Sequence, residues 1–427
     1  MQKRNLTFGL ALVGVIGVVA VAAEAMDDRV AEDQAGTVPL FEVDPFWPKP
    51  LPNHWLIGPT IGVATDANDG VWIVQRNTLN QFVLNTEVGM VTDTSYYNDE
   101  APELRNGTAL SECCQPGPPI MHFDPEGNLL HAWGGPGTET GDYTWPSSNH
   151  GITVDGQGNV WVGGNGGSDR HILKFTADGR FLAQYGTPGA EPSSTSRTNF
   201  SQVAKVSFDE ELNEIFVADG YGNRRVAVLD AATGEMKRFW GAKGNVPDDA
   251  AAEALPAYRP GETPPNQFRT PVHCADRATD GLVYVCDRPS NRLSVFRTDG
   301  TFVRETIIAP NTLSQGSTWD VAFSPDAQQR FMYLADGQNM RVYVMDRQSL
   351  EILYSFGDGG RQPGLFFAVH SIATDSQGNI FTTETYEGSR IQKFRYTGMG
   401  ARPSTRDAGA AWPQARRSGP YGWDFEN

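Results

Sequence analysis

The sequence predicts an all-β protein folded as a six-bladed β-propeller. Three observations support this prediction. A pair of strand-like segments recurs six times, a second pair follows it in most copies, and several copies end in an aromatic residue followed by glycine. Four short strands repeated at roughly 40–50 residues are typical of propeller blades. A chain of 427 residues is long enough for one large domain of this kind.

The first half of each repeat is a strand, a turn of the Asp/Gly/Asn type and a second strand. One copy, at 150–164, reads HGITVDGQGNVWVGG, and another, at 370–384, reads HSIATDSQGNIFTTE. Alternating apolar residues interrupted by such a turn indicate a β-hairpin. The other four copies lie at 61–76, 204–220, 273–287 and 319–337.

The second half of the repeat has the same alternation, broken by a tight turn. Clear copies occur at 171–186, 225–241, 292–305 and 341–357. The aromatic-glycine endings are Trp133-Gly134, Tyr185-Gly186, Trp240-Gly241 and Phe356-Gly357. Together the two halves predict four antiparallel strands per blade.

The last repeat has only three clear strands, ending at 391–396, and a strand-like segment at 39–44 precedes the first repeat. We expect the early segment to complete the sixth blade, since closing the ring removes exposed strand edges. The propeller is assigned to 38–398, with an insertion at 84–117 in blade one. The tail, 399–427, is rich in Arg, Pro, Ala and Gly and is expected to be loosely ordered.

The N-terminus has the features of an export signal. Lys3 and Arg4 precede an apolar run over 10–23, and Ala23-Glu24-Ala25 offers small residues at a cleavage position. We predict a cleaved signal peptide at 1–25 and a periplasmic or secreted protein. The alternative is an uncleaved N-terminal anchor, because the apolar run is long for a signal core and short for a spanning helix.

The formal net charge is −17 at pH 7. Nucleic acid and anionic membranes require a basic face, so neither is an expected partner, beyond the contact of the export signal with the membrane. The expected ligand is a small-molecule or peptide-like substrate. The sequence carries no indication of the oligomeric state.

The four cysteines of an exported chain are expected to form disulfides. Cys274 and Cys286 flank the short turn at 278–282, and a symmetric hairpin places them opposite each other, close enough to bridge. Cys113 and Cys114 are adjacent in the chain, and their pattern is compatible with a vicinal disulfide or with two separate thiols.

Aligning the repeats brings three histidines to one position. The residue that opens the innermost strand of blades one to six is, in order, Ile61, His150, Ala204, His273, Trp319 and His370. Inner strands line the axis of a propeller, so histidines in alternate blades converge on the channel. Three imidazoles with an open fourth position are typical of a catalytic zinc site, and ligand type favours Zn²⁺. The alternative is three unrelated core histidines, the role we assign to His54, His122, His131 and His171.

A second position adds charge to the same end of the channel. Arg76 and Arg288 follow the second strand of blades one and four, and the turn at 219–224 places Tyr221 on the same face of the ring. Two guanidiniums and a phenol suit a substrate with a carboxylate or carbonyl group. The alternative for Arg288 alone is a surface ion pair.

These residues resemble a known family, the NHL-repeat propeller enzymes called peptidyl-α-hydroxyglycine α-amidating lyases. The resemblance covers roughly residues 55–396, and its motifs are VQR at Arg76, NHGI at His150, DGYGNRR at Tyr221, PVHC at His273, CDRPSNR at Arg288 and AVHSI at His370. It implies that the three histidines bind zinc, that Tyr221 is the base, and that the two arginines bind or polarise the substrate.

The reaction implied by the resemblance is cleavage of a carbinolamide C–N bond, which releases an amide and glyoxylate. A tyrosine base needs a pKa well below about 10, and we expect the arginines and the metal to lower the pKa of Tyr221. The chain departs from the family at two positions. Ser371 stands where the family has an aspartate of a calcium site, which argues against Ca²⁺, although backbone carbonyls can supply part of such a site. Gly222 stands where the family has a cysteine.

Two other functions fit the same fold. A metal-dependent hydrolase of lactones or esters ranks second. Lactonase-like propellers usually bind calcium through carboxylate and Asn side chains, whereas the aligned position of this chain offers histidines. A non-catalytic NHL-type binding propeller ranks third, because it gives no reason for histidines in alternate blades beside Tyr221, Arg76 and Arg288.

Overall fold

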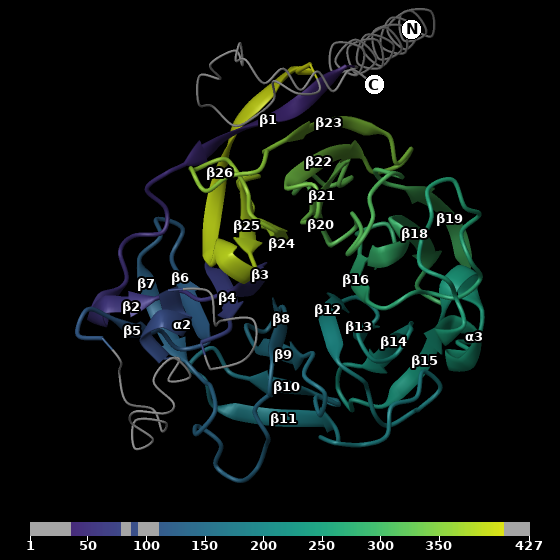
Figure 1. Cartoon of the computed structure of the whole chain (residues 1–427), viewed down its shortest axis with the longest axis horizontal. Helices are drawn as coiled ribbons and strands as arrows, with labels where there is room; N and C mark the ends of the chain where they lie inside the picture. The colour runs from purple at the N-terminus through teal and green to yellow at the C-terminus, as the bar shows by residue number, and fades with distance from the viewer. Residues whose placement is uncertain (1–35, 78–86, 93–110, 405–427) are drawn as a thin grey trace, which may run out of the picture.

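A computed structural model describes residues 36–77, 87–92 and 111–404. The expected signal peptide at 1–25, much of the expected insertion and most of the expected tail lie outside these residues. Six four-stranded antiparallel sheets surround a central axis, so the predicted six-bladed β-propeller is confirmed (Figure 1). Among the described residues no helix is long and apolar enough to cross a membrane.

The first three blades follow one another along the chain, each running from the axis outward. Blade one consists of β3 (Thr60–Thr65), β4 (Val71–Gln75), β6 (Ile120–Phe123) and β7 (Leu129–Trp133). Blade two consists of β8 (Asn149–Val154), β9 (Val160–Gly164), β10 (His171–Phe175) and β11 (Phe181–Gly186). Blade three consists of β12 (Val203–Asp209), β13 (Glu214–Asp219), β14 (Arg225–Asp230) and β15 (Met236–Trp240).

The other three blades complete the ring. Blade four consists of β16 (Val272–Arg277), β17 (Leu282–Asp287), β18 (Arg292–Arg297) and β19 (Phe302–Ile307). Blade five consists of β20 (Asp320–Phe323), β21 (Phe331–Asp336), β22 (Arg341–Asp346) and β23 (Ile352–Phe356). Blade six consists of β24 (Val369–Thr374), β25 (Ile380–Glu384), β26 (Arg390–Ala401) and β1 (Thr37–Asp44).

The ring closes where β1 pairs with β26, as predicted (Figure 1). The pairing runs from Thr37 opposite Ala401 to Asp44 opposite Lys393, so β26 extends three residues beyond the expected boundary at 398. Closure covers the edge that β26 would otherwise expose. The short strands β2 (Trp55–Leu56) and β5 (Gln115–Pro116) pair outside the six blades.

Short helical segments connect the strands. Among the described residues they are α2 (Glu87–Thr92), α3 (Asp249–Glu253), η1 (Pro52–His54), η4 (Ala242–Gly244), η5 (Arg288–Ser290) and η6 (Tyr386–Gly388). Both cysteine pairs are oxidised. Cys274 lies opposite Cys286 across β16 and β17 and forms the predicted disulfide, and Cys113 and Cys114 form a vicinal disulfide. Disulfides are typical of oxidising, extracytoplasmic compartments.

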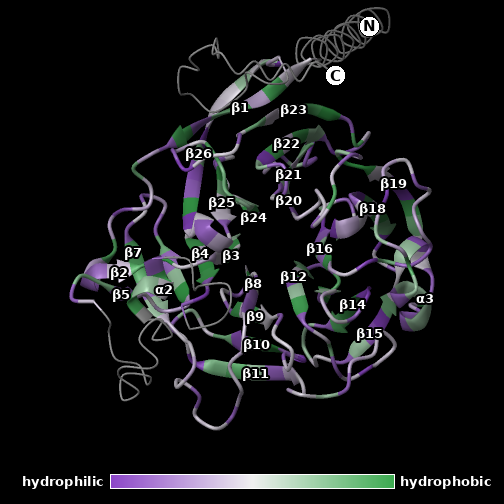
Figure 2. Cartoon of the chain, viewed as in Figure 1, coloured by the Kyte–Doolittle hydropathy of each residue, from purple (hydrophilic) through white to green (hydrophobic). Residues whose placement is uncertain are grey.

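The core lies between neighbouring blades, because each sheet packs a hydrophobic face on the next. Hydrophobic and hydrophilic residues are interspersed along the strands (Figure 2). Trp72 and Val74 of blade one pack with Val162 and Phe175 of blade two, all fully buried. Burying a side chain such as Phe175 stabilises the fold by about 1.5–3 kcal/mol.

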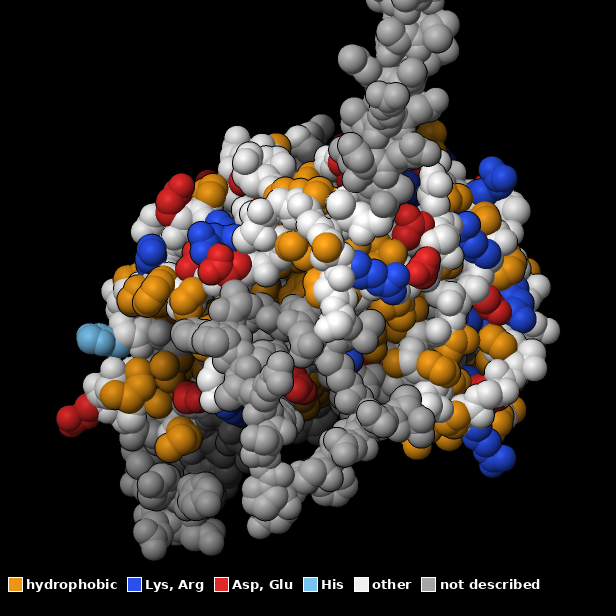
Figure 3. Space-filling view, turned by 90° about the horizontal axis from the view of Figure 1, so that it is seen from above, with side chains coloured by type: hydrophobic (Ala, Val, Ile, Leu, Met, Phe, Trp, Pro, Cys, Tyr) orange, Lys and Arg blue, Asp and Glu red, His pale blue; other side chains and the backbone are white. Residues whose placement is uncertain are grey.

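The aromatic-glycine endings take part in this packing. Trp133 contacts Phe175 of the next blade with ring centroids 5.1 Å apart, and Trp240 contacts Phe296 of the next blade at 5.8 Å. Gly134 adopts φ +85°, a conformation that favours glycine and turns the chain out of the blade. On the face drawn in Figure 3, acidic and basic side chains lie among hydrophobic ones.

Candidate metal centre

The inner strands carry a β-bulge at the position where the repeats align. In five of the six blades the pairing of the innermost strand with the second strand shifts by one residue there. His273 and His370 are themselves the residues without a partner on the second strand, and in blade two the shift falls at Gly151, next to His150. Because bulges re-aim side chains, this irregularity turns the three histidines toward the axis.

The three histidines meet in the channel, as the repeat alignment predicts. One ring nitrogen of each lies within 4.8 Å of the corresponding atoms of the other two, a spacing that a single metal ion could bridge. The ring centroids are 4.7–5.2 Å apart, and His150, His273 and His370 are between 1% and 4% exposed.

Two of the three imidazoles are oriented by a backbone carbonyl of the following blade. Nδ1 of His150 donates to the Ala204 carbonyl at 2.8 Å, and Nδ1 of His273 donates to the Trp319 carbonyl at 2.5 Å. The corresponding group for His370 is the Ile61 carbonyl, which interacts with the ring but lies outside good hydrogen-bond geometry. A carbonyl only accepts, so Nδ1 of His150 and of His273 carries the hydrogen and Nε2 presents its lone pair.

Burial keeps the three imidazoles neutral. It lowers the pKa of His150 to about 3, and the charges of Arg76 and Arg288 act in the same direction. The pKa values of His273 and His370 lie well below the ordinary value, again chiefly because of burial. Neutral imidazole is the form that binds metals.

Tyr221 reaches the same point from the turn after β13. Its hydroxyl lies 3.0 Å from Nε2 of His150 and 3.0 Å from Nε2 of His273. The single phenol hydrogen can be donated to only one of these two nitrogens. A metal cation could bind the lone pairs of both. A Cβ at Gly222 would come within 1.9 Å of the Ser201 hydroxyl, so a larger residue next to Tyr221 would need the Ser201 side chain to move.

The acidity of Tyr221 is set by burial and by the neighbouring guanidiniums. Burial raises its pKa, and the opposing effects of Arg288 and Arg76 are smaller. The two arginines act in the expected direction, but alone they do not bring the pKa of the phenol below its ordinary value. The effect of a metal on this pKa stays a prediction. The remaining group that could do so is a metal cation, whose field would act at the same atoms.

Arg288 opens η5 directly after β17 and lies beside Tyr221. Its Nη1 donates to the Tyr221 hydroxyl at 3.2 Å, and its guanidinium stacks 4.5 Å from the Trp319 ring centroid. It is 7% exposed, and no ion pair joins it to another residue of 36–77, 87–92 or 111–404. Arg288 is therefore not part of a surface ion pair in the described residues, which was the alternative interpretation.

Arg76 directly follows β4 and is 4% exposed. Its Nη2 donates to the Asn165 side-chain oxygen at 2.9 Å, and the Ser148 hydroxyl donates to the same oxygen. Burial lowers the pKa of Arg76 below its ordinary value. Tyr221 and Tyr386 oppose this effect without reversing it, so both phenols lie within electrostatic range of the guanidinium.

Two residues of this site escaped the sequence reasoning. Trp319 stands in the aligned position of blade five but was given no role, although it stacks on Arg288 and accepts from His273. Asn165 directly follows β9, the position in blade two that Arg76 and Arg288 occupy in blades one and four, so the alignment of the repeats could have picked it out. The cavity at the centre also takes in Lys205, Asp320 and Ser371, one residue after the aligned position in blades three, five and six.

The chain is similar to known proteins at low sequence identity. No protein family model matches the sequence. NHL repeat-containing protein 3 of Mus musculus is 23% identical over 325 residues, which cover 74% of this chain and 70% of that protein. Peptidyl-alpha-hydroxyglycine alpha-amidating lyase 1 of Drosophila melanogaster is 24% identical over 64% of this chain and 50% of that protein. The chain is a homologue of NHL-repeat proteins and of amidating enzymes.

The homology does not extend over the whole of the longer relatives. Peptidyl-glycine alpha-amidating monooxygenase B of Xenopus laevis is 24% identical over 57% of this chain, and the match spans only 26% of that protein. Among solved structures, a streptogramin B lyase aligns with a TM-score of 0.45 and 14% identity over 85% of this chain and 99% of that chain.

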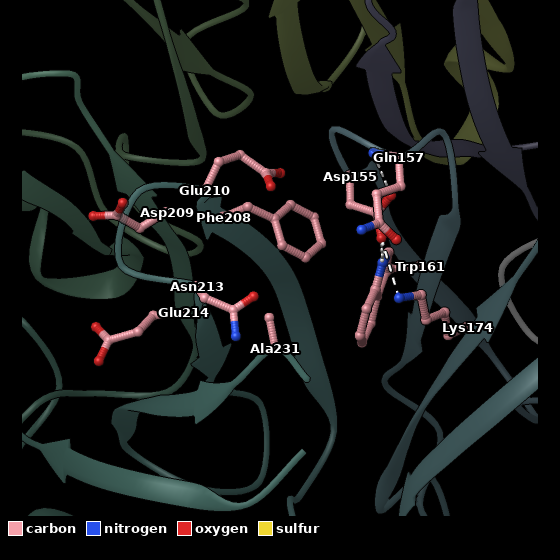
Figure 4. Close-up of a pocket in the computed structure, with 10 residues that line it drawn as sticks. All are labelled: Asp155, Gln157, Trp161, Lys174, Phe208, Asp209, Glu210, Asn213, Glu214 and Ala231. Atoms are coloured by element: carbon pink, nitrogen blue, oxygen red, sulfur yellow. Dashed lines mark hydrogen bonds and ion pairs between the residues drawn. The ribbon is translucent and has the colours of Figure 1, made fainter. Parts of the chain in front are cut away.

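Figure 4 shows another pocket, which lies between blades two and three. Its acidic side chains already have partners. Asp155 accepts from Trp161 Nε1 at 2.9 Å and pairs with Lys174 at 3.3 Å. Glu214 of β13 pairs with Lys237 and Arg238 of β15.

The four histidines predicted to have no ligand role lie outside the group of three channel histidines. One of them, His122, stacks on Trp72 with ring centroids 3.8 Å apart.

Proposed function

We propose that this protein is an exported, metal-dependent lyase whose zinc ion binds to His150, His273 and His370. The proposed reaction cleaves the carbinolamide C–N bond of a peptide ending in α-hydroxyglycine and releases a peptide amide and glyoxylate. The observation that carries the proposal is the convergence of three neutral imidazoles in the channel, two of them in contact with the Tyr221 hydroxyl, to which Arg288 also donates. The homology to amidating enzymes supports it.

The donor set fits a zinc ion. Three imidazole nitrogens suit Zn²⁺, and an open position remains for substrate. A bound zinc ion would act as a Lewis acid toward the oxygen of the substrate hydroxyl. The carbonyls of Ala204 and Trp319 hold two of the imidazoles in the orientation that presents Nε2.

The remaining residues account for the proton and the charge. Cleavage moves one hydrogen from the substrate hydroxyl to the departing amide nitrogen, as the C–N bond breaks and a C=O bond forms. In the proposed step Tyr221 acts as a phenolate, the form that a bound cation would favour: it takes up the proton of the substrate hydroxyl and then donates it to the departing nitrogen. Arg288 donates toward the same point, and a guanidinium there stabilises the negative charge of the substrate oxygen or carboxylate.

The test is an assay of the protein with an α-hydroxyglycine-capped peptide, following glyoxylate release, with and without a chelator. We expect glyoxylate release that chelator abolishes and added zinc restores. A protein that binds zinc but releases no glyoxylate would contradict the lyase, and lactones and esters would be the next substrates. A protein inactive on all three classes would point to a binding propeller.

A further inference from the structure

The central channel holds a second polar compartment. Lys205, Asp320 and Ser371 each directly follow the aligned position of their blade, and they line the same cavity as the three histidines. Asp276, on β16 of blade four, completes the group by its contact with Lys205. The four side chains thus come from four different blades.

One ammonium group joins two carboxylates in this compartment. Lys205 Nζ lies 2.8 Å from Asp276 Oδ1 and 2.7 Å from Asp320 Oδ1. The other oxygen of Asp320 accepts from the Ser371 hydroxyl at 2.6 Å and from the backbone N–H of Ile372 at 3.1 Å. The second oxygen of Asp276 is buried and has no hydrogen-bond partner among the described residues.

Two carboxylates brought together away from water need a cation. Removing charged groups from water costs several kcal/mol per ion unless they are paired. Burial lowers the pKa of Lys205, but the two carboxylates outweigh burial and raise that pKa above its ordinary value. Lys205 is therefore charged, and it supplies the cation.

The same carboxylates would otherwise suit a metal ion. Ligand atoms of Cys274, Asp276 and Asp320 lie within 4.8 Å of one another, but the sulfur of Cys274 is bonded to Cys286 and cannot act as a thiolate. Only oxygen ligands remain, and oxygen ligands suit a hard cation such as Ca²⁺. Lys205 Nζ is within bonding distance of both carboxylates, where such a cation would bind.

We propose that the Lys205 ammonium is the fixed cation of this compartment and excludes a second divalent ion from the channel. The channel then holds at most one exchangeable metal ion, at the histidines, and a two-metal mechanism is unavailable. This inference concerns cation occupancy and does not depend on the lyase activity.

The test is calorimetric titration of the purified protein with Ca²⁺ up to about 1 mM, the weak end of protein calcium sites. Wild type is expected to take up no Ca²⁺, whereas Lys205→Ala is expected to bind about one Ca²⁺ per chain. The matched control is the double variant Lys205→Ala with Asp276→Asn, which removes one carboxylate and should lose that uptake. Lys205→Gln, which is neutral but polar, is the second variant should Lys205→Ala not fold.

Two results would overturn the inference. One is Ca²⁺ uptake by wild type that Asp276→Asn abolishes, since the compartment would then accept a divalent ion beside the lysine. The other is a folded Lys205→Ala or Lys205→Gln protein, with cooperative unfolding, that takes up no Ca²⁺. Neither readout requires an active enzyme, so failure of this inference and failure of the lyase can be told apart.

Discussion

The channel histidines are held by backbone carbonyls, and this determines the charge of the centre. Ala204 and Trp319 accept from His150 and His273, and no carboxylate among the described residues does so. A neutral acceptor orients an imidazole without adding negative charge. A divalent ion bound there would keep its full positive charge for the substrate, and it would act directly on Tyr221.

The first prediction concerns proton transfer. Tyr221→Phe should retain the metal and the fold, because the ring stays in place and only the hydroxyl is lost. Turnover should fall by roughly 10²–10⁴-fold, the usual effect of removing one proton-transfer group. The measurement is kcat for glyoxylate release together with zinc content. Unchanged kcat with full zinc would mean that the hydroxyl of Tyr221 has no part in the chemistry.

The second prediction concerns the metal ligands. Wild-type protein should bind about one zinc ion per chain, and His150→Ala should lose both the ion and the activity, because two imidazoles remain. His171→Gln is the matched control, since His171 is equally buried but bonds the Thr144 carbonyl outside the centre. Elemental analysis after dialysis checks both variants. Equal zinc in wild type and His150→Ala would exclude this site.

At the scale of single elements, the bulge of the inner strand is what makes the site. A regular strand would leave every residue paired and would point alternate side chains into the blades on either side. The extra residue in β16 and β24 breaks that alternation at His273 and His370. The disulfide between Cys274 and Cys286 lies immediately after the bulge of β16 and ties this strand to β17.

The third prediction concerns this disulfide. Replacing Cys274 and Cys286 by serine should lower the free energy of unfolding by about 2–3 kcal/mol, because the bridge restricts the unfolded chain over a short loop. The matched control is replacement of Cys113 and Cys114 by serine, which opens a bridge between adjacent residues and should change stability much less. Urea unfolding of both variants decides, and equal losses would contradict the argument.

At the scale of the whole molecule, closure of the ring by β1 sets the positions of all six blades. The three channel histidines come from blades two, four and six, and blade six is completed by residues from the two ends of the described chain. Val43 of β1 is 5% exposed and packs in the cluster between blades five and six. Opening this contact should therefore affect stability and the metal site together.

The fourth prediction tests ring closure. Val43→Asp should lower the free energy of unfolding by about 2–4 kcal/mol, because it buries an unpaired carboxylate at the closing strand. It should also weaken metal binding at the distant centre. Glu42→Gln is the matched control, since Glu42 is partly exposed and pairs with Arg395 at the surface. Equal stability of the two variants would mean that β1 contributes little to closure.

The fifth prediction concerns pH. Burial lowers the pKa of His150 from 6.5 to about 3, so between these values the unfolded chain binds a proton that the folded protein does not. The free energy of unfolding of the metal-free protein should therefore rise with pH across this window and fall as acid is added. His150→Asn should reduce the slope by up to about 1.4 kcal/mol per pH unit. Urea unfolding in chelator at several pH values would show whether the slopes differ.

The repeat by itself determined the blades, the closing strand and the convergence of the three histidines, and the symmetry of one hairpin determined the Cys274–Cys286 bridge. The first three features follow from periodicity, because residues at equivalent positions of a repeat occupy equivalent places around the axis. Tyr221 and the two arginines were found in the same way. The position of a residue within its own blade could therefore be predicted from the sequence.

Only the tertiary structure decided what depends on contacts between blades. The stacking of Trp319 on Arg288 and the pairing of Lys205 with Asp276 and Asp320 join residues from different blades. The raised pKa of Tyr221 depends on how deeply it is buried, a quantity that no local pattern carries. Side-chain contacts and desolvation are set by the packing of the closed ring, whereas sequence periodicity gives only the equivalent positions of residues around the axis.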